Sequence, residues 1–301
     1  MEKQEKRAIE ILQTFASKDP YQLGYSGGKD SDVILHLAKK SSVLFTAVHN
    51  LTTVDAPETV RYIQSKKDVI IQRPRLSMWQ LIEKKKMPPT RLCRYCCAEL
   101  KERSGKGKKV ITGVRAAESR SRANNHGIIT FPQPTAAMRR MEKGEMETTT
   151  KGGLILNYEN SESHRTVENC YRTSKTLVNP ILDWEDDFLW WYIKHEQIEV
   201  NPLYNNGLPG GCKRIGCIGC PMAGKKERLK EFEKYPAYKN MYLQAFTRML
   251  KHRKEDGDKT DWKNAQDVFD WWLEDTDIKG QVKMEFDDQN NLIGFQQKGG
   301  G

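Results

Sequence analysis

The residues best suited to chemistry lie in the segment Ser26-Gly27-Gly28-Lys29-Asp30-Ser31. Its paired glycines let the backbone approach a ligand closely or adopt a positive φ. Apolar residues recur at helical spacing behind the segment, so the turn should direct backbone N–H groups and the positive end of a helix dipole at one spot. Lys29 and the two serine hydroxyls add donors, and Asp30 and Ser31 are expected to cap the helix. The segment predicts a site for an anion such as phosphate or sulfate.

Cysteines are the second chemical feature of the sequence. Six of the seven form two groups, each with a Cys-x-x-Cys, and Cys170 stands alone as an expected buried small residue. Two such groups far apart in a chain indicate one shared metal site. Four thiolates can hold zinc or a [4Fe–4S] cluster. Two quartets fit the spacing: Cys93, Cys96, Cys217 and Cys220, or Cys96, Cys97, Cys217 and Cys220.

The composition limits the class of protein. The chain has 301 residues, 37% of them apolar and 30% charged, and a formal net charge of +10. This charge suits anionic partners, a nucleotide or a nucleic acid. No apolar run approaches the ~18 residues of a membrane span, and the first residues do not form a signal peptide. We therefore expect no membrane association and a cytoplasmic location, where clustered cysteines indicate metal or redox chemistry rather than disulfides.

Strand and helix patterns alternate through the first part of the chain. Strands are expected at 21–24, 43–48, 69–71, 109–113 and 177–181, and helices at 2–16, from Pro57, around 79–82 and at 184–196. This alternation predicts an α/β fold, a twisted parallel sheet with helices on both faces. Ligands bind such sheets at the carboxyl ends of the strands. Segments 26–31, 49–55 and 114–122 should therefore lie together.

The second half of the chain is less regular. Residues 138–153 are charged and without periodicity, which fits either a lid near the site or a plain surface insertion. Helices are expected at 225–252 and 261–275, and a hairpin at 281–286 and 292–297. We predict an adenine-nucleotide-binding domain with the cysteine site at 1–222 and a helical region ending in a hairpin at 223–301.

Several motifs match known families. The loop is neither a Walker phosphate loop nor the dinucleotide fingerprint; it resembles the pyrophosphate (PP) loop of the adenine nucleotide alpha-hydrolase superfamily. The order of the motifs that follow it resembles the phosphoadenosine phosphosulfate (PAPS) and adenylylsulfate reductase family. These motifs are Val54–Thr59, Thr112–Arg122, Asn179–Trp184 and Asn201–Tyr204. Cys96, Cys97 and Lys101 with Cys217 and Cys220 look like the cluster signature of adenylylsulfate reductases, which implies a [4Fe–4S] cluster rather than zinc.

The resemblance implies reduction of an adenylyl sulfonucleotide with release of sulfite. It implies catalytic roles for Lys29, Asp30 and Arg115, and a thiol reductant such as a thioredoxin as partner. Cys212, Cys93 or a partner thiol would be the nucleophile. The residues expected to bind the nucleotide are Ser26, Gly27, Gly28, Lys29, Asp30, Ser31, Asp55, Gly113, Arg115, Arg120 and Arg122.

Two alternatives remain open. The complete loop is typical of ATP-cleaving relatives, and the sequence has no cysteine after Cys220. The chain could therefore be an ATP-dependent sulfurtransferase that adenylates and thiolates a nucleic acid or a small molecule. Asp30 and Asp55 would then contact Mg²⁺, although Asp55 could instead cap the helix at Pro57. The third interpretation is a non-catalytic nucleotide-binding module with structural zinc.

Overall fold

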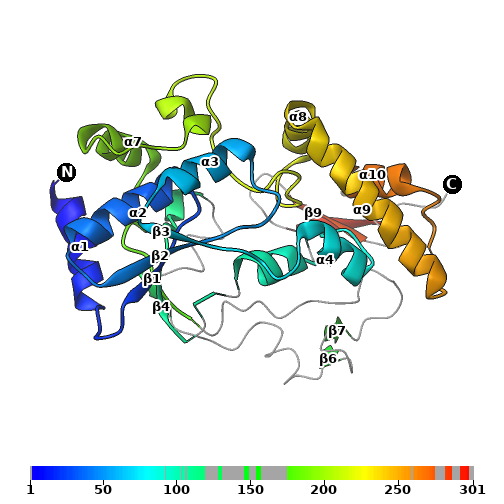
Figure 1. Cartoon of the computed structure of the whole chain (residues 1–301), viewed down its shortest axis with the longest axis horizontal. Helices are drawn as coiled ribbons and strands as arrows, with labels where there is room; N and C mark the ends of the chain where they lie inside the picture. The colour runs from blue at the N-terminus through cyan, green and yellow to red at the C-terminus, as the bar shows by residue number, and fades with distance from the viewer. Residues whose placement is uncertain are drawn as a thin grey trace. The chain divides into compact units, whose positions relative to one another are not determined.

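The computed structural model describes most of the chain (Figure 1). The ranges are 2–91, 93–102, 104–105, 107–118, 128–130, 146–148, 154–156, 175–258, 260–274, 282–286 and 292–297. Contacts divide the chain into two compact units. The first comprises Met1–Met78, Cys96–Thr135 and Cys170–Ile218, and the second comprises Trp79–Tyr95, Ala136–Asn169 and Gly219–Gly301. Each unit thus combines three separate segments, whereas the domains proposed above are consecutive and remain a prediction.

A six-stranded sheet forms the centre of the first unit. Its order is β3 (Val69–Gln72), β2 (Phe45–Asn50), β1 (Tyr21–Gly24), β4 (Lys109–Ile111), β8 (Thr176–Val178) and β5 (Ile129–Thr130). Neighbours from β3 to β8 are parallel, and β5 pairs antiparallel with β8. The predicted parallel α/β fold is confirmed, while the short edge strand β5 was not predicted.

Helices pack on this sheet through apolar faces. They are α1 (Glu2–Thr14), α2 (Lys29–Lys40), α3 (Pro57–Ser65) and α7 (Asp186–His195). Leu23 of β1 and Ile34 and Leu37 of α2 are fully buried in one core. Pro57 occupies the first turn of α3, where its fixed φ is favourable and its missing N–H is not needed.

The order of the strands sets the place of the site. The chain runs outward from β1 through β2 to β3 and then returns to β4 on the other side of β1. The carboxyl ends of β1 and β4 therefore flank a point where the strand order reverses, and such a point is where open α/β sheets bind ligands. The Ser26–Ser31 segment follows β1, and Gly113 and Arg115 follow β4.

The second unit is mainly helical. It contains α4 (Met78–Lys85) from Trp79 onward, α8 (Lys225–Lys234), α9 (Pro236–Glu255), α10 (Ala265–Glu274) and the antiparallel pair β9 (Val282–Phe286) and β10 (Leu292–Gln297). The predicted hairpin is confirmed. The predicted single helix at 225–252 is wrong, because Pro236 disfavours helical geometry at Tyr235, whose φ is −125° and ψ is 67°.

Part of the segment that we expected to be irregular is paired. One short strand, β6 (Met146–Thr148), lies within residues 138–153 and pairs antiparallel with β7 (Leu154–Leu156), which directly follows them. The remainder of 138–153 lies outside the described residues, so its expected role as a lid stays a prediction. Within the described ranges, no helix combines the length and apolarity needed to cross a membrane.

Candidate functional site

The loop after β1 is shaped by its glycines. Gly27 has a φ of +73°, and a Cβ there would lie 2.9 Å from the side chain of Ile63. Helix α2 begins at Lys29 with Gly28 as its N-cap, so the prediction that Asp30 or Ser31 is the N-cap residue is wrong. Ser31 lies one turn inside the helix. Its hydroxyl accepts the Gly28 N–H at 3.0 Å and donates to the Gly28 carbonyl at 2.7 Å.

The Asn201–Tyr204 motif braces this loop. Asn201 is fully buried, and its Nδ2 donates to the Gly27 carbonyl at 3.2 Å and to Thr59 Oγ1 at 3.0 Å. The Tyr204 hydroxyl oxygen accepts the backbone N–H of Lys29. Hydroxyl groups therefore already hold two of the N–H groups expected to bind an anion. A hydroxyl that accepts an N–H can still donate its own proton to a ligand oxygen.

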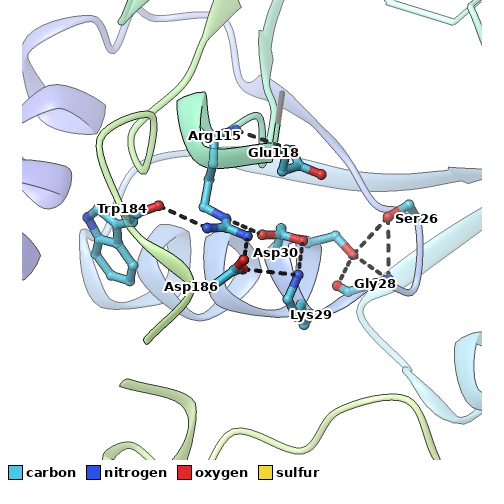
Figure 2. A network of polar contacts seen from close by, with 9 residues as sticks. Ser26, Gly28, Lys29, Asp30, Arg115, Glu118, Trp184 and Asp186 are labelled. Atoms are coloured by element: carbon cyan, nitrogen blue, oxygen red, sulfur yellow. Dashed lines mark hydrogen bonds and ion pairs between the residues drawn. The ribbon is translucent and has the colours of Figure 1, made fainter. Parts of the chain in front are cut away.

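Charged side chains from three segments meet beside the loop (Figure 2). Arg115 is 1% exposed, and its Nε and Nη2 donate at 2.6 Å to Asp30 Oδ1 and Asp186 Oδ1, respectively. Its Nη1 donates to the Trp184 carbonyl at 2.9 Å. Although burial opposes its charge, pairing with Asp30 and Asp186 raises the pKa of Arg115. The guanidinium is thus held by protein groups on all three nitrogens.

Lys29 belongs to the same network. Its Nζ lies 3.3 Å from Asp30 Oδ2 and 3.9 Å from Asp186 Oδ1, and the residue is 7% exposed. Asp186 is the most exposed member, with 64% of its side chain accessible. A ligand anion near Lys29 would compete with these two carboxylates for the buried Lys29 ammonium. Both cations are therefore positioned before any ligand binds.

The segment that follows β4 packs tightly against the start of α2. A Cβ on Gly113 would lie 3.0 Å from the Cβ and the carbonyl group of Asp30, so a larger residue would force the start of α2 to shift. The Thr112 hydroxyl donates to Asn179 Oδ1, and the Ala116 N–H donates to the Leu182 carbonyl at 2.8 Å. The Asn179–Trp184 motif therefore positions the segment that carries Arg115.

A cavity of about 180 Å³ opens at the carboxyl ends of β1 and β2. Ser26 lines it together with His49, Asp55 and Lys101. Asp55 does not cap α3, whose N-cap is Ala56; its Oδ2 accepts the Thr52 N–H at 2.8 Å. His49 Nδ1 lies 3.0 Å from the Tyr25 carbonyl oxygen. The cavity thus joins the loop to a group of polar side chains from β2 and the segment after it.

Lys101 connects this cavity with sulfur. It ends a π-helical turn, Cys97–Lys101, and its ammonium hydrogen-bonds Cys217. Attraction by Cys217, and further by Asp55 and Cys97, raises the pKa of Lys101, so the ammonium stays charged near neutral pH. Burial raises the pKa of the Cys217 thiol, with Lys101 opposing it. Cys217 also donates to Thr52 Oγ1 at 3.5 Å, and its backbone bridges to Asp55.

The predicted metal quartet draws on both units. Cys96, Cys97 and Cys217 lie in the first, and Cys220 and the alternative ligand Cys93 lie in the second. The positive charge of Lys101 would stabilise the negative charge of thiolates that bind a metal, at Cys217 and Cys97. Across the described ranges, however, no three His, Cys, Asp or Glu side chains gather as a metal-binding group. The cluster, its zinc alternative and the choice of quartet therefore stay predictions.

The remaining predicted residues divide into two sets. Arg120, Arg122 and Cys170 lie outside the described residues, and Cys212 is exposed. The sequence interpretation missed Asp186 and Tyr204 as partners of the loop. The available signal for Tyr204 is its place in the Asn201–Tyr204 motif. Asp186 carried no such signal, because its partner Arg115 is 71 residues away.

Comparison with known sequences identifies the family. The phosphoadenosine phosphosulfate reductase domain matches residues 20–223, which is more than half of the chain. The chain belongs to the phosphoadenosine phosphosulfate reductase domain family. An uncharacterised protein of Methanocaldococcus jannaschii is 26% identical over 264 residues, covering 82% of this chain and 54% of the relative. The chain thus spans about half of that relative's length.

One short sequence match and two solved structures are also similar to this chain. The adenosine 5′-phosphosulfate reductase of Allochromatium vinosum is 39% identical over 46 residues, covering 15% of this chain and 16% of that enzyme. Among solved structures, the PAPS reductase of Candida auris in a phosphate complex is similar, with 16% identity, 72% of this chain and 93% of that chain covered, and a TM-score of 0.41. An NMN synthetase of Francisella tularensis follows with 11% identity, coverage of 90% and 92%, and a TM-score of 0.33.

Proposed function

We propose that this chain is an enzyme that binds an adenine nucleotide at the loop and carries out sulfur chemistry on it. The observation that carries the proposal is the shared cavity. Ser26 of the loop and Lys101 line the same space, and Lys101 hydrogen-bonds the Cys217 sulfur. An anion-binding loop and a thiol beside a cation thus adjoin one cavity. Family membership supports the same class of substrate.

The first candidate reaction is reduction of adenylylsulfate or PAPS. The loop donors and Lys29 would hold the oxyanion end, while Arg115 keeps Asp30 and Asp186 in place. A thiolate of the reductant attacks the sulfonate sulfur, the S–O bond breaks, and the nucleotide leaves with the electron pair. A second thiolate then attacks the sulfonated thiol's sulfur, so that a disulfide forms and sulfite leaves. Sulfur gains two electrons, and the two thiols supply them.

A thioredoxin-like protein would serve as the reductant. The short match to the adenosine 5′-phosphosulfate reductase of Allochromatium vinosum supports this first candidate. The predicted [4Fe–4S] cluster, with Cys96, Cys97, Cys217 and Cys220 as its ligands, would supply electrostatic stabilisation if it is bound. None of the steps above depends on it.

The second candidate is ATP-dependent sulfur transfer. It is favoured by the carboxylates of Asp30 and Asp186 beside Lys29, because Mg²⁺ bound with ATP prefers such hard oxygen ligands. An oxygen of the acceptor attacks the α-phosphate and pyrophosphate leaves; sulfur from a donor then displaces AMP. The acceptor would be a small molecule or a nucleic acid, whose phosphates suit the net charge of +10.

Anaerobic turnover of adenylylsulfate, PAPS and Mg²⁺–ATP, each with a thiol reductant, tests the proposal. Sulfite release from either sulfonucleotide supports the first candidate, and pyrophosphate release from ATP supports the second. Lys29→Met should abolish the activity, whereas Lys39→Met, on the same helix but paired with Asp68 at the surface, should retain it. Nucleotide binding without either product would instead support the non-catalytic module.

A further inference from the structure

His49 has a fixed ring orientation at the end of β2. The residue is 4% exposed, and its Nδ1 lies 3.0 Å from the Tyr25 carbonyl oxygen. A carbonyl oxygen only accepts hydrogen bonds, so Nδ1 must carry the proton. In the neutral ring Nε2 is then left with a lone pair and acts as an acceptor.

The Nε2 atom lacks a hydrogen-bond partner within the described part of the chain. The Oδ2 of Asp55 lies 3.9 Å from His49 Nε2. Both atoms are acceptors, so neither satisfies the other. Buried polar atoms are nearly always hydrogen-bonded, and both residues line the cavity beside Ser26. The pair therefore forms a position in the cavity that is suited to a hydrogen-bond donor.

The protonation state of His49 supports this geometry. Burial lowers the pKa of His49. Asp55 and the Tyr25 carbonyl oppose that effect, while the nearby ammonium of Lys101 adds to it. The ring is therefore neutral near pH 7 and does not form an ion pair with Asp55.

We propose that His49 is a specificity-determining residue that accepts a hydrogen bond from an uncharged N–H or O–H group of the nucleotide. This inference rests on the proposed function. An adenine nucleotide offers two such sources, the exocyclic amine of the base and the ribose hydroxyls. Its phosphate and sulfate oxygens only accept, so they belong at the loop, where Lys29 and the hydroxyls are donors. The cavity thus orients the nucleotide with its oxyanion at the loop and a donor at His49.

Binding of AMP and its analogues tests this inference. AMP is the fragment common to adenylylsulfate, PAPS and ATP. Calorimetry would compare AMP with purine riboside 5′-monophosphate, which lacks the amine, and with 2′-deoxy- and 3′-deoxy-AMP, which each lack a hydroxyl. The wild-type chain should bind one of these analogues about ten-fold more weakly than AMP, as expected for a lost hydrogen bond in a buried site. The analogue affected identifies the donor.

Two variants separate recognition from folding. His49→Asn keeps an N–H that can donate to the Tyr25 carbonyl but removes the Nε2 acceptor. It should bind AMP about ten-fold more weakly and lose the discrimination. His36→Asn is the matched control, because His36 lies on α2 against Glu196 and does not line this cavity. The ¹⁵N shift of His49 Nε2 should also change when AMP binds to the wild-type chain.

The outcomes are distinct. Equal affinity of the wild-type chain for AMP and every analogue would overturn the role of His49 while leaving the proposed function intact. Discrimination that persists in His49→Asn would overturn it as well. Failure of the wild-type chain to bind AMP, adenylylsulfate, PAPS and ATP would overturn both proposals. If His49→Asn fails to fold, the analogue series and the ¹⁵N shift on the wild-type chain still decide the question.

Discussion

Replacing Arg115 by methionine should destabilise the protein, because the guanidinium holds together three segments of the first unit. Its donors contact Asp30 and Asp186 at 2.6 Å and the Trp184 carbonyl at 2.9 Å. Only 1% of the Arg115 side chain and 18% of the Asp30 side chain are exposed. Methionine has a similar length but donates no hydrogen bond. It would leave the Asp30 carboxylate and the Trp184 carbonyl without these donors.

The free energy of unfolding lost in Arg115→Met is the sum of the contributions of these contacts. A hydrogen bond between charged groups contributes about 1.5–3 kcal/mol, and an unsatisfied buried carbonyl costs about 1–3 kcal/mol. The Asp186 contact adds little, about 0.5 kcal/mol, since 64% of that side chain is exposed. We therefore expect a loss of about 3 kcal/mol. At about 2–4 °C per kcal/mol, this loss lowers the melting temperature by about 6–12 °C.

Thermal unfolding, monitored by circular dichroism and tryptophan fluorescence, would measure this decrease in the melting temperature. Asp186→Asn, the matched control on the exposed side of the network, should shift the melting temperature by about 2 °C or less. In a double-mutant cycle, Asp30→Asn and Arg115→Met should show a coupling energy of about 2 kcal/mol. A shift below about 2 °C for Arg115→Met, or additive effects in the cycle, would refute the interpretation of Arg115 as a positioning residue.

Three further predictions concern the loop and its surroundings. Gly27→Ala should lower the melting temperature more than Gly107→Ala does. Both glycines have a φ of +73°, but of the two only Gly27 would place a Cβ against a side chain, that of Ile63 at 2.9 Å. Equal shifts of the melting temperature would contradict this prediction. Burial raises the pKa of Asp32 from 3.8 to about 7, so the folded state binds the extra proton and stability should fall as pH rises from about 4 to 7. Asp32→Asn should remove this dependence on pH, which melting curves at several pH values would measure. The same slope of melting temperature against pH in the variant and the wild-type chain would contradict the prediction. Tyr204→Phe should weaken phosphate-ester binding about ten-fold by calorimetry, because it removes a hydroxyl that can donate to a ligand oxygen. It should also lower the melting temperature, because the buried Lys29 N–H loses its acceptor; unchanged affinity would disprove the role in binding.

Local patterns were sufficient to predict the strands and most helices of the first unit. Alternating buried strands and amphipathic helices specify a parallel sheet, and the glycine pair specifies the turn after β1. The start of α2 was misplaced because Asp30 and Ser31 are good capping residues in isolation. In the folded chain Ser31 instead hydrogen-bonds Gly28, and Asp30 pairs with Arg115.

Pairing across long sequence distances accounts for what could not be predicted. Nothing near Arg115 indicates that Asp186 and the Trp184 carbonyl will hold it, since only the fold brings these segments together. The role of His49 Nε2, which has no hydrogen-bond partner among the residues that the structure describes, likewise depends on the Tyr25 carbonyl, because this carbonyl fixes the tautomer. The break before Pro236, by contrast, is encoded locally: proline disfavours helical geometry at the preceding residue, although the periodicity on either side favours a single helix.

The most direct test of the central claim is a calorimetric titration of Lys29→Met and Lys39→Met with adenylylsulfate and with Mg²⁺–ATP. Both lysines lie on α2, but Lys29 is buried beside the loop and Lys39 pairs with Asp68 at the surface. The site described here predicts that Lys39→Met binds the preferred nucleotide as the wild-type chain does, and that Lys29→Met binds it at least about ten-fold more weakly. Equal affinities of the two variants would contradict the assignment of the loop as the nucleotide site.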